Sequence, residues 1–230
     1  MNNLRLKFTL FLILTIFSQG FSFAQTGVKP ATFRNTYYDV RRAAHEQEGL
    51  PEGAVIFMGN SITEQGWWSM LFKTKDIENR GIGGDNTFGM IDRLPDILAS
   101  SPVKIFLMAG INDISLDYSL DTIVSNIRYM IRLSKEKAPG CEFYVQSVLP
   151  LNDSRLAFPA VKGKNPVVKE LNSRLKAMCD EEGVLYLDIA SLLTDENGEL
   201  KLALTKDGLH IHPQAYIIWA DYLKKSGLLK

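Results

Sequence analysis

Four short polar segments of the chain contain the residue types that acyl transfer requires. Ser61 lies in "GNSIT", directly after an apolar run, and His210 ends "DGLH", in which Asp207 precedes it by three residues. Acyl transfer needs a nucleophile, a base within hydrogen-bond reach and an acid that orients the base. A carboxylate at 207 can accept the imidazole N–H and fix its tautomer. Ser61, His210 and Asp207 therefore predict a catalytic triad.

The other two segments supply candidate donors for an oxyanion. "GIGGDNT" contains Gly84, and "GINDI" contains Asn112. The amides of Ser61 and Gly84 and the side-chain NH2 of Asn112 make three N–H donors, the groups that stabilise the charge developing in the transition state. A glycine at 84 lets its amide approach the oxyanion without a blocking side chain.

Each of these residues also has an ordinary structural interpretation. Ser61 and Glu64 fit the S-x-x-E capping box at a helix start. Gly84 can serve a turn that needs positive φ, and Asn112 can cap a turn through its side chain. His210 can be a packed histidine at a helix entry. Only the four segments together favour chemistry over local structure.

A metal site is a further alternative near the C-terminus. Asp207, His210 and His212 could act as ligands, but two histidines two residues apart match a zinc site poorly without another ligand cluster. We therefore expect no metal and no cofactor, and we place His212 in the wall of the pocket. His45 lies in a predicted helix and is expected to be unrelated to the chemistry.

Apolar runs that alternate with helical patterns predict the elements that position these residues. The predicted strands are 54–59, 77–82, 104–110, 142–149 and 184–189. The predicted helices are 37–48, 64–72, 87–98, 120–137, 166–182 and 213–226. Continuous apolar strands separated by helices predict a three-layer α/β/α sandwich around a five-stranded parallel sheet. Ligands bind beyond the carboxyl ends of such strands, and the polar segments follow those ends; Asp85, Asp113 and Asp188 there are expected to form supporting hydrogen bonds.

The four segments resemble the blocks of the SGNH hydrolases, the GDSL-type esterase/lipase superfamily, in the family's order. The resemblance implies a flavodoxin-like fold, esterase activity, and roles for Ser61, Gly84, Asn112 and His210 with Asp207. One departure is Asn60-Ser61-Ile62, where the family name expects Asp-Ser-Leu, so the supporting turn is expected to differ. The chain has no G-x-S-x-G, which argues against an ordinary α/β-hydrolase.

The N-terminus has the features of a secretory signal peptide at 1–24. Arg5 and Lys7 precede the apolar "FTLFLILTIF", and Ser22 and Ala24 have the small-residue spacing of a cleavage site after Ala24. A retained membrane anchor is the alternative, but the apolar run is shorter than the ~20 residues that span a bilayer. We expect a periplasmic or secreted protein without stable membrane insertion after cleavage, with one hydrolase domain at 25–230.

Composition limits the partners. The 26 Lys and Arg residues balance 26 Asp and Glu, and no basic stripe supports nucleic-acid binding. Cys141 and Cys179 either pair or remain free, and both are expected at the end of the sheet far from the catalytic edge. The residues do not determine an oligomeric state.

The substrate is expected to be a small-molecule or glycan ester. The predicted leader, the short loops and the resemblance to carbohydrate O-acetylesterases together favour acetyl groups on glycans, including sialic acid. Trp67 or Trp68 could stack on a sugar, unless both are core aromatics. A lysophospholipase or general short-chain carboxylesterase is the second hypothesis. The third is a catalytically silent carbohydrate-binding module on a hydrolase scaffold.

Overall fold

The computed structural model describes residues 32–229, so the predicted leader at 1–24 lies outside the described residues. In this part of the chain, five parallel strands form one sheet in the order β2-β1-β3-β4-β5. The strands are β1 (Val55–Gly59), β2 (Ile77–Gly81), β3 (Lys104–Met108), β4 (Glu142–Gln146) and β5 (Leu185–Leu187). This is the flavodoxin-like strand order, and the predicted five-stranded parallel sheet is confirmed.

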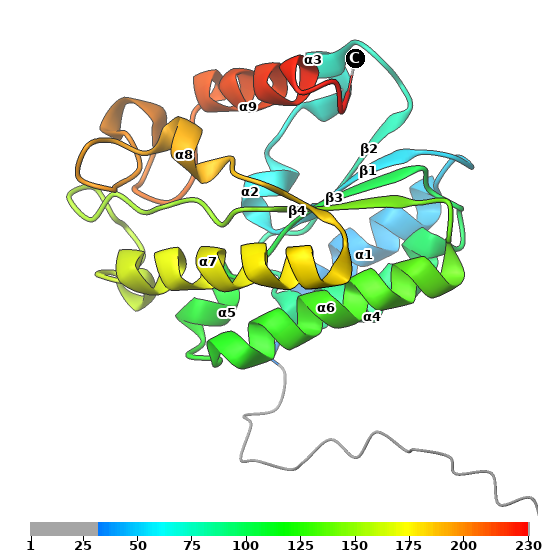
Figure 1. Cartoon of the computed structure of the whole chain (residues 1–230), viewed down its shortest axis with the longest axis horizontal. Helices are drawn as coiled ribbons and strands as arrows, with labels where there is room; N and C mark the ends of the chain where they lie inside the picture. Colours follow the sequence, from blue (N-terminus) through cyan, green and yellow to red (C-terminus); the bar gives the residue numbers. More distant parts are fainter. Residues whose placement is uncertain (1–31, 230) are drawn as a thin grey trace, which may run out of the picture. The chain divides into compact units, whose positions relative to one another are not determined.

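Helices cover both faces of the sheet (Figure 1). One face carries α1 (Thr36–Glu48), α4 (Thr87–Leu98), α6 (Leu120–Lys137) and α7 (Asn165–Glu182), and the other carries α3 (Trp68–Phe72), α8 (Ala190–Leu193) and α9 (Pro213–Lys225). Two short helices, α2 (Ser61–Glu64) and α5 (Ile111–Ser115), begin directly beyond β1 and β3. Two 3₁₀ turns, η1 (Pro159–Val161) and η2 (Leu202–Leu204), complete the elements of the described residues.

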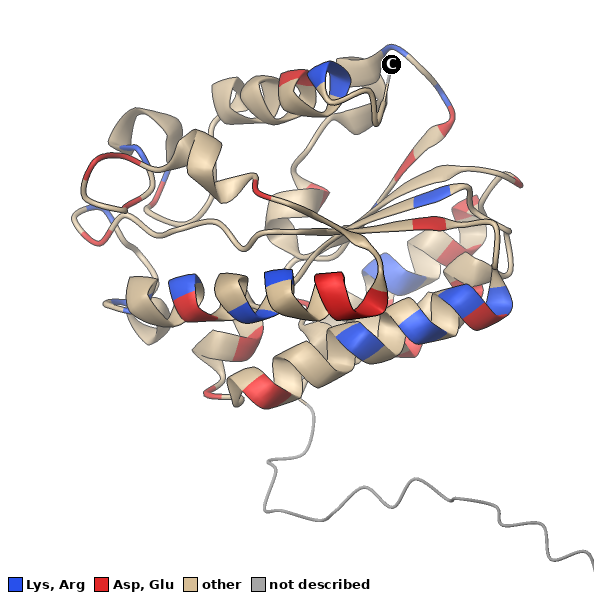
Figure 2. Cartoon of the chain, in the orientation of Figure 1, with Lys and Arg blue, Asp and Glu red and all other residues tan. Residues whose placement is uncertain are grey.

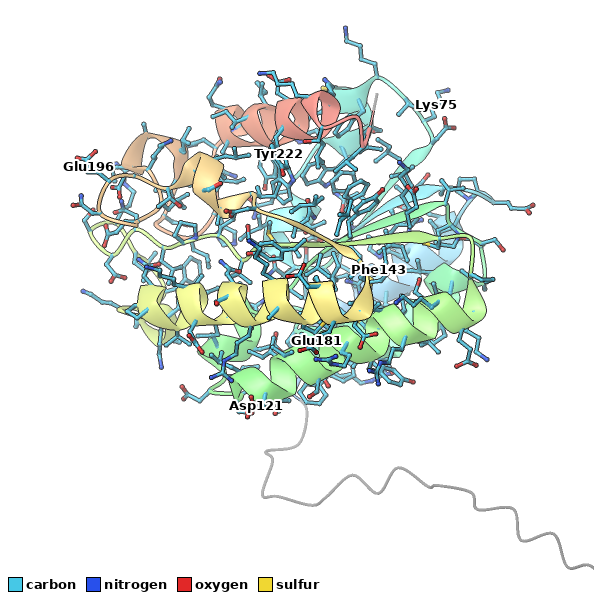
Figure 3. The ribbon with its side chains drawn as sticks, viewed as in Figure 1. Lys75, Asp121, Phe143, Glu181, Glu196 and Tyr222 are labelled. Carbon is cyan, nitrogen blue, oxygen red and sulfur yellow. The ribbon has the colours of Figure 1, made fainter. Side chains whose placement is uncertain are left out.

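Apolar side chains on both faces of the sheet make the core. On the α3/α9 face, aromatic rings from successive strands stack across the sheet: Phe57 on Phe106 at 5.0 Å, and Phe106 on Tyr144 at 4.7 Å between centroids. On the opposite face, Phe143 of β4 lies among the side chains that fill the space toward α7 (Figure 3). Burial on both faces explains why the strands are continuous apolar runs.

The predicted helix 64–72 is wrong, because the chain forms two short helices, α2 and α3, with Gly66 between them. A β-carbon at Gly66 would lie 2.4 Å from the ring of Trp68, which folds back over this turn. The Trp68 indole N–H donates to the carbonyl of Thr63 at 2.9 Å, and its ring stacks on Phe57. Trp68 is thus a core aromatic, whereas Trp67 is 53% exposed.

The two cysteines are free. Cys141 directly precedes β4, and the carbonyl of Cys179 accepts from the amide of Val184 just before β5. Both therefore lie at the amino ends of strands, away from the carboxyl edge, as predicted.

The surface of the described residues carries both signs of charge. Basic and acidic residues both occur on α6 and α7 (Figure 2), where Arg128 and Arg132 of α6 both pair with Glu182 of α7. Within residues 32–229, no helix is long and apolar enough to cross a membrane.

Candidate active site

The three residues of the predicted triad meet at the carboxyl edge of the sheet. His210 Nε2 lies 2.9 Å from Ser61 Oγ, although the two residues are 149 positions apart in sequence. His210 Nδ1 lies 2.8 Å from Asp207 Oδ2. A base so placed can take the serine proton, while the carboxylate fixes the ring's tautomer and orientation.

A closed turn holds the acid and the base together. Asp207 Oδ1 accepts from the amides of His210 at 2.7 Å and Leu209 at 3.0 Å. The Thr205 hydroxyl donates to the carbonyl of His210 and accepts from the amide of Gly208, both at 2.8 Å. Burial alone would raise the pKa of Asp207, but the hydrogen bonds from His210 and Leu209 outweigh it and hold the pKa below its ordinary value. Asp207 is therefore ionised, as a partner of an imidazolium must be.

Ser61 does not cap its helix, so the capping-box interpretation is wrong. Asn60 is the N-cap of α2, and its side-chain oxygen accepts from the amide of Ile62 at 3.0 Å. Ser61 is the first helical residue, and its hydroxyl contacts His210 instead of an orphan amide. The side chain of Glu64 bonds to groups outside its own helix. The asparagine that departs from the GDSL pattern thus performs the capping task.

The loop that carries Gly84 runs beside Ser61, and Asn112 bonds to the same loop. Gly84 has φ +77°, and no atom of the described residues lies within 4 Å of the position of a β-carbon there. A β-carbon at neighbouring Gly83 would lie 3.8 Å from the β-carbon of Ser61, so this loop runs beside the nucleophile. Among the backbone hydrogen bonds of residues 32–229, none takes up the amides of Ser61 or Gly84. Asn112 uses one N–H to bond the carbonyl of Asp85 at 2.7 Å, which leaves its second N–H for a ligand.

A buried arginine, which we did not predict, fixes the loop after β2. Arg93 of α4 is only 4% exposed, and it donates to Asp85, to the carbonyl of Arg80 and to the carbonyl of Gly59. Burial raises the pKa of Asp85 to about 6 despite the charge of Arg93. Arg93 thus ties the ends of β1 and β2 to the loop that carries Gly84. Its sequence context has no signal that separates it from other polar residues of a helix.

Asp113 ties the third segment to the second, which confirms the supporting role expected of it. Its fully buried carboxylate accepts from the Thr87 hydroxyl at 2.5 Å and from the Thr87 amide at 3.1 Å. Asn126 of α6 donates to the same hydroxyl at 2.8 Å. Asp188, in contrast, is exposed and accepts from the amide of Ser191.

The Asp113 carboxyl is expected to give the fold a specific pH dependence. Burial raises its pKa to about 6 from 3.8, although the bonds from Thr87 oppose this. Because the folded state then holds the proton to higher pH than the unfolded state, the free energy of unfolding should fall as pH rises from about 4 to about 6. Asp113→Asn should reduce this pH-dependent loss of unfolding free energy by on the order of 2 kcal/mol. Urea unfolding at several pH values measures it, with Asp121→Asn, whose side chain is 87% exposed, as control; equal slopes in both variants would contradict the prediction.

The other two histidines make different contacts. His45 of α1 is buried against Arg41 at 3.3 Å, and burial, then the charges of Arg80, Arg93 and Arg41, lower its pKa to about 3. The backbone of His212 bonds to Leu204 at the start of α9. Within residues 32–229, no group of three or more His, Cys, Asp or Glu side chains could hold a metal ion.

Two large cavities lie away from the triad. One of about 430 Å³ lies between α1 and α4, and one of about 560 Å³ lies between α7 and the segment after β5. Beside His210 itself, the ring of Phe158 makes an edge contact at 5.3 Å and remains 38% exposed. Nothing in the sequence pattern indicated this aromatic residue.

A family model matches most of the described chain, over residues 57–217, and its description is "GDSL-like Lipase/Acylhydrolase family". The chain belongs to the GDSL-like lipase/acylhydrolase family. It is therefore a hydrolase, and the resemblance drawn from the four segments is confirmed at the level of the family. The matched range includes Ser61, Gly84, Asn112, Asp207 and His210, but begins after α1.

Solved structures share this GDSL fold. A GDSL-like lipase from Bacteroides thetaiotaomicron VPI-5482 is 27% identical, covers 82% of this chain and 94% of its own, and has a TM-score of 0.68. A variant of Axe2, an acetylxylan esterase from Geobacillus stearothermophilus, is 17% identical with a TM-score of 0.62, covering 77% of this chain and 96% of its own. The second likeness is one of fold alone.

Curated relatives of this GDSL protein carry a different name. An N-acylneuraminate cytidylyltransferase from Streptococcus agalactiae serotype III is 25% identical over 164 residues, and one from Escherichia coli O18:K1:H7 is 24% identical over 191 residues. The matches cover 71% and 81% of this chain, but only 36% and 42% of those proteins. The chain thus spans less than half the length of these relatives.

Proposed function

We propose that this chain is a serine esterase that removes short acyl groups, chiefly acetyl, from carbohydrates. Ser61 is the nucleophile, His210 the general base and Asp207 the orienting acid. The observation that carries the proposal is the continuous contact from Asp207 through His210 to Ser61, at 2.8 and 2.9 Å. These are the distances and the order that an acyl-transfer triad requires.

The proposed mechanism uses only groups of this chain. His210 Nε2 takes the proton of Ser61 as Oγ attacks the ester carbonyl, and the imidazolium is stabilised by ionised Asp207. The amides of Ser61 and Gly84, with the side chain of Asn112, donate to the oxyanion of the tetrahedral intermediate. His210 then gives its proton to the departing sugar oxygen, which leaves as the alcohol. In the second half, His210 takes a proton from water as the water attacks the acyl-enzyme, and it returns the proton to Ser61 Oγ as the carboxylic acid leaves.

Three observations support a sugar as the alcohol part of the ester. Phe158 presents an exposed ring beside His210, where a sugar face can stack. The fold neighbour Axe2 is an acetylxylan esterase, and the curated relatives are named for N-acylneuraminate, an acidic sugar. Third, Lys206 lies on the turn that carries Asp207 and His210, and its ammonium donates to Gln65 at 2.8 Å.

Lys206 favours an acidic sugar among these substrates. Gln65 follows Ser61 by four residues, so their side chains share a helix face. In residues 32–229, Lys206 is in no ion pair with a carboxylate, whereas Glu64 nearby pairs with Arg41. A sugar carboxylate would therefore meet an uncompensated positive charge close to the nucleophile. We include O-acetylated sialic acid in the proposed substrate class for this reason.

The predicted leader at 1–24 supports a reaction outside the cytoplasm as part of the proposal. A charged start, an apolar run and a small-residue site before 25 together support secretion to the periplasm or beyond. Glycans of that compartment are the proposed substrates.

A panel of esters tests the substrate class. We expect release of acetate from O-acetylated sialic acid and acetylated xylo-oligosaccharides at a kcat/KM at least tenfold above release of fatty acid from lysophosphatidylcholine, measured by enzymatic acetate assay and mass spectrometry. Lys206→Met should raise KM for the acidic sugar about threefold to fivefold, the upper range of an exposed charge pair, and leave KM for the neutral sugar within twofold. A preference for lysophosphatidylcholine would favour the lysophospholipase hypothesis instead.

A further inference from the structure

The carboxylate of Glu64 joins three segments of the chain beside the nucleophile. Its Oε2 accepts from the backbone amide of Gly83 at 2.8 Å. Its Oε1 accepts from the hydroxyl of Tyr37 and from Nε of Arg41, each at 2.8 Å. The Glu64 side chain is only 16% exposed, and its bonds to Gly83 and Arg41 are partly buried, whereas its bond to Tyr37 is exposed.

The position of Glu64 connects it directly to the catalytic geometry. It lies three residues after Ser61, in the last turn of α2, so the two side chains are neighbours on one helix. A β-carbon at Gly83 would lie 3.0 Å from Glu64 Oε2, 3.1 Å from the Tyr37 ring and 3.8 Å from the β-carbon of Ser61. Gly83 is therefore enclosed by these groups, and its successor Gly84 carries the proposed oxyanion amide.

We propose that Glu64, held by Tyr37 and Arg41 of α1, is a positioning residue that fixes the Gly83–Gly84 loop against Ser61. The inference rests on the proposed esterase function and deepens it. One oxygen of the carboxylate fixes the direction of the Gly83 N–H, and hence the plane of the Ile82–Gly83 peptide, which directly precedes the peptide that carries the Gly84 amide. The other oxygen anchors Glu64 to α1, so the loop cannot turn its amide away without losing its bond to an anchored carboxylate.

The α1 helix supplies the second half of the arrangement. Tyr37 and Arg41 are four residues apart, so they extend from the same face of α1. The family match begins at residue 57, after α1 has ended at Glu48. A segment outside the matched range thus completes the support of the loop that should bind the oxyanion.

The proposed role requires a carboxylate at position 64. In Glu64→Gln, one acceptor oxygen must serve either Gly83 or the Tyr37–Arg41 pair, and the new NH2 then faces a donor at the other site. The side chain keeps its size, so the fold keeps its packing. The loop, however, loses its fixed register relative to Ser61, and a displacement of about 1 Å in a catalytic group can cost about 10²-fold in rate.

The test compares matched variants of the full mature chain with p-nitrophenyl acetate and an acetylated sugar. We expect Glu64→Gln to lower kcat about 30- to 100-fold with KM within twofold, because positioning of an oxyanion donor acts on the transition state. The acid limb of the kcat/KM profile against pH should stay in place, since the Ser61–His210–Asp207 contacts are untouched. Arg42→Gln, which removes the neighbouring ion pairs of α1 with Asp92 and Asp96, should stay within twofold of wild type.

A double-mutant cycle separates the contacts of Tyr37 and Arg41 with Glu64 from a general effect of α1. Arg41→Met and Tyr37→Phe should each lower kcat about three- to tenfold in the wild-type background, and neither should lower it further in Glu64→Gln. Thermal unfolding of every variant gives the fraction of folded protein at the assay temperature, and each rate is divided by that fraction. Equal losses in Glu64→Gln and Arg42→Gln, additive effects of Arg41→Met and Glu64→Gln, or an unchanged kcat in Glu64→Gln would each overturn the proposal. An inactive wild-type chain would instead refute the esterase function itself.

Discussion

Ser61→Ala is expected to lower kcat for p-nitrophenyl acetate by about 10⁶-fold, because no other group can form the acyl-enzyme. The hydroxyl that lies 2.9 Å from His210 Nε2 is the proposed nucleophile. Its removal leaves the cap at Asn60 and the packing of α2 unchanged, so the variant should fold normally. Stopped-flow release of p-nitrophenol measures the loss, since wild type should give a burst equal to the enzyme concentration and Ser61→Ala none.

The control for this substitution is Ser69→Ala. Ser69 lies on α3, is exposed, and should tolerate the change with kcat within twofold of wild type. Full activity in Ser61→Ala would refute the nucleophile, whatever the other variants do. A parent chain that binds acetylated sugar without hydrolysing any ester would favour the silent binding module.

Asp207→Asn is expected to lower kcat by about 10⁴-fold with little change in KM, the effect known for loss of the orienting acid in serine hydrolases. Asn Oδ1 can still accept from the amides of His210 and Leu209, so the turn stays closed. The new NH2 then faces His210 Nδ1, which must become the acceptor. Nε2 consequently carries the proton and cannot take one from Ser61.

Asp188→Asn is the matched control for the acid. Asp188 also follows a strand and accepts from a backbone amide, but it bonds to Ser191 instead of a histidine. We expect its kcat to stay within twofold, as measured by initial rates across pH 5 to 9. A loss below tenfold in Asp207→Asn would contradict the assignment of Asp207 as the orienting acid.

Residue type and order predicted much of this molecule for physical reasons that can be named. Strands buried on both faces must be apolar throughout, so runs such as 104–110 were recognisable, although β3 ends at Met108. Parallel strands bring their carboxyl ends to one edge, so Ser61, Gly84 and Asn112 could be placed there without any contact information. His210 was assigned to the same site from triad chemistry and the resemblance to the SGNH blocks. The Asp207–His210 pair needed only the spacing of a single turn.

The parts that were not predicted depend on contacts that no local pattern encodes. Glu64 stands where a capping box requires a glutamate, and only the path of the loop after β2 gives its carboxylate a different partner. Arg93 reaches three acceptors from different segments, and nothing in α4 marks it. The helix predicted over 64–72 failed because the Trp68 indole folds back toward Thr63 across Gly66. Tertiary packing overrode helical periodicity at that point.

The turn that carries the acid and the base is closed by its own bonds, through Thr205 and Gly208. The amides of Asn152 and Ala157 also hold it, by donating to the carbonyls of Gly208 and Asp207. Asp207 and His210 are therefore held together in one preformed turn, separate from the helix that carries Ser61. A displacement of this turn as a rigid unit would break the contact between His210 and Ser61 while the Asp207–His210 contact stayed intact. Its return would restore the triad. The activity of this enzyme could thus be controlled through the position of this one turn relative to Ser61.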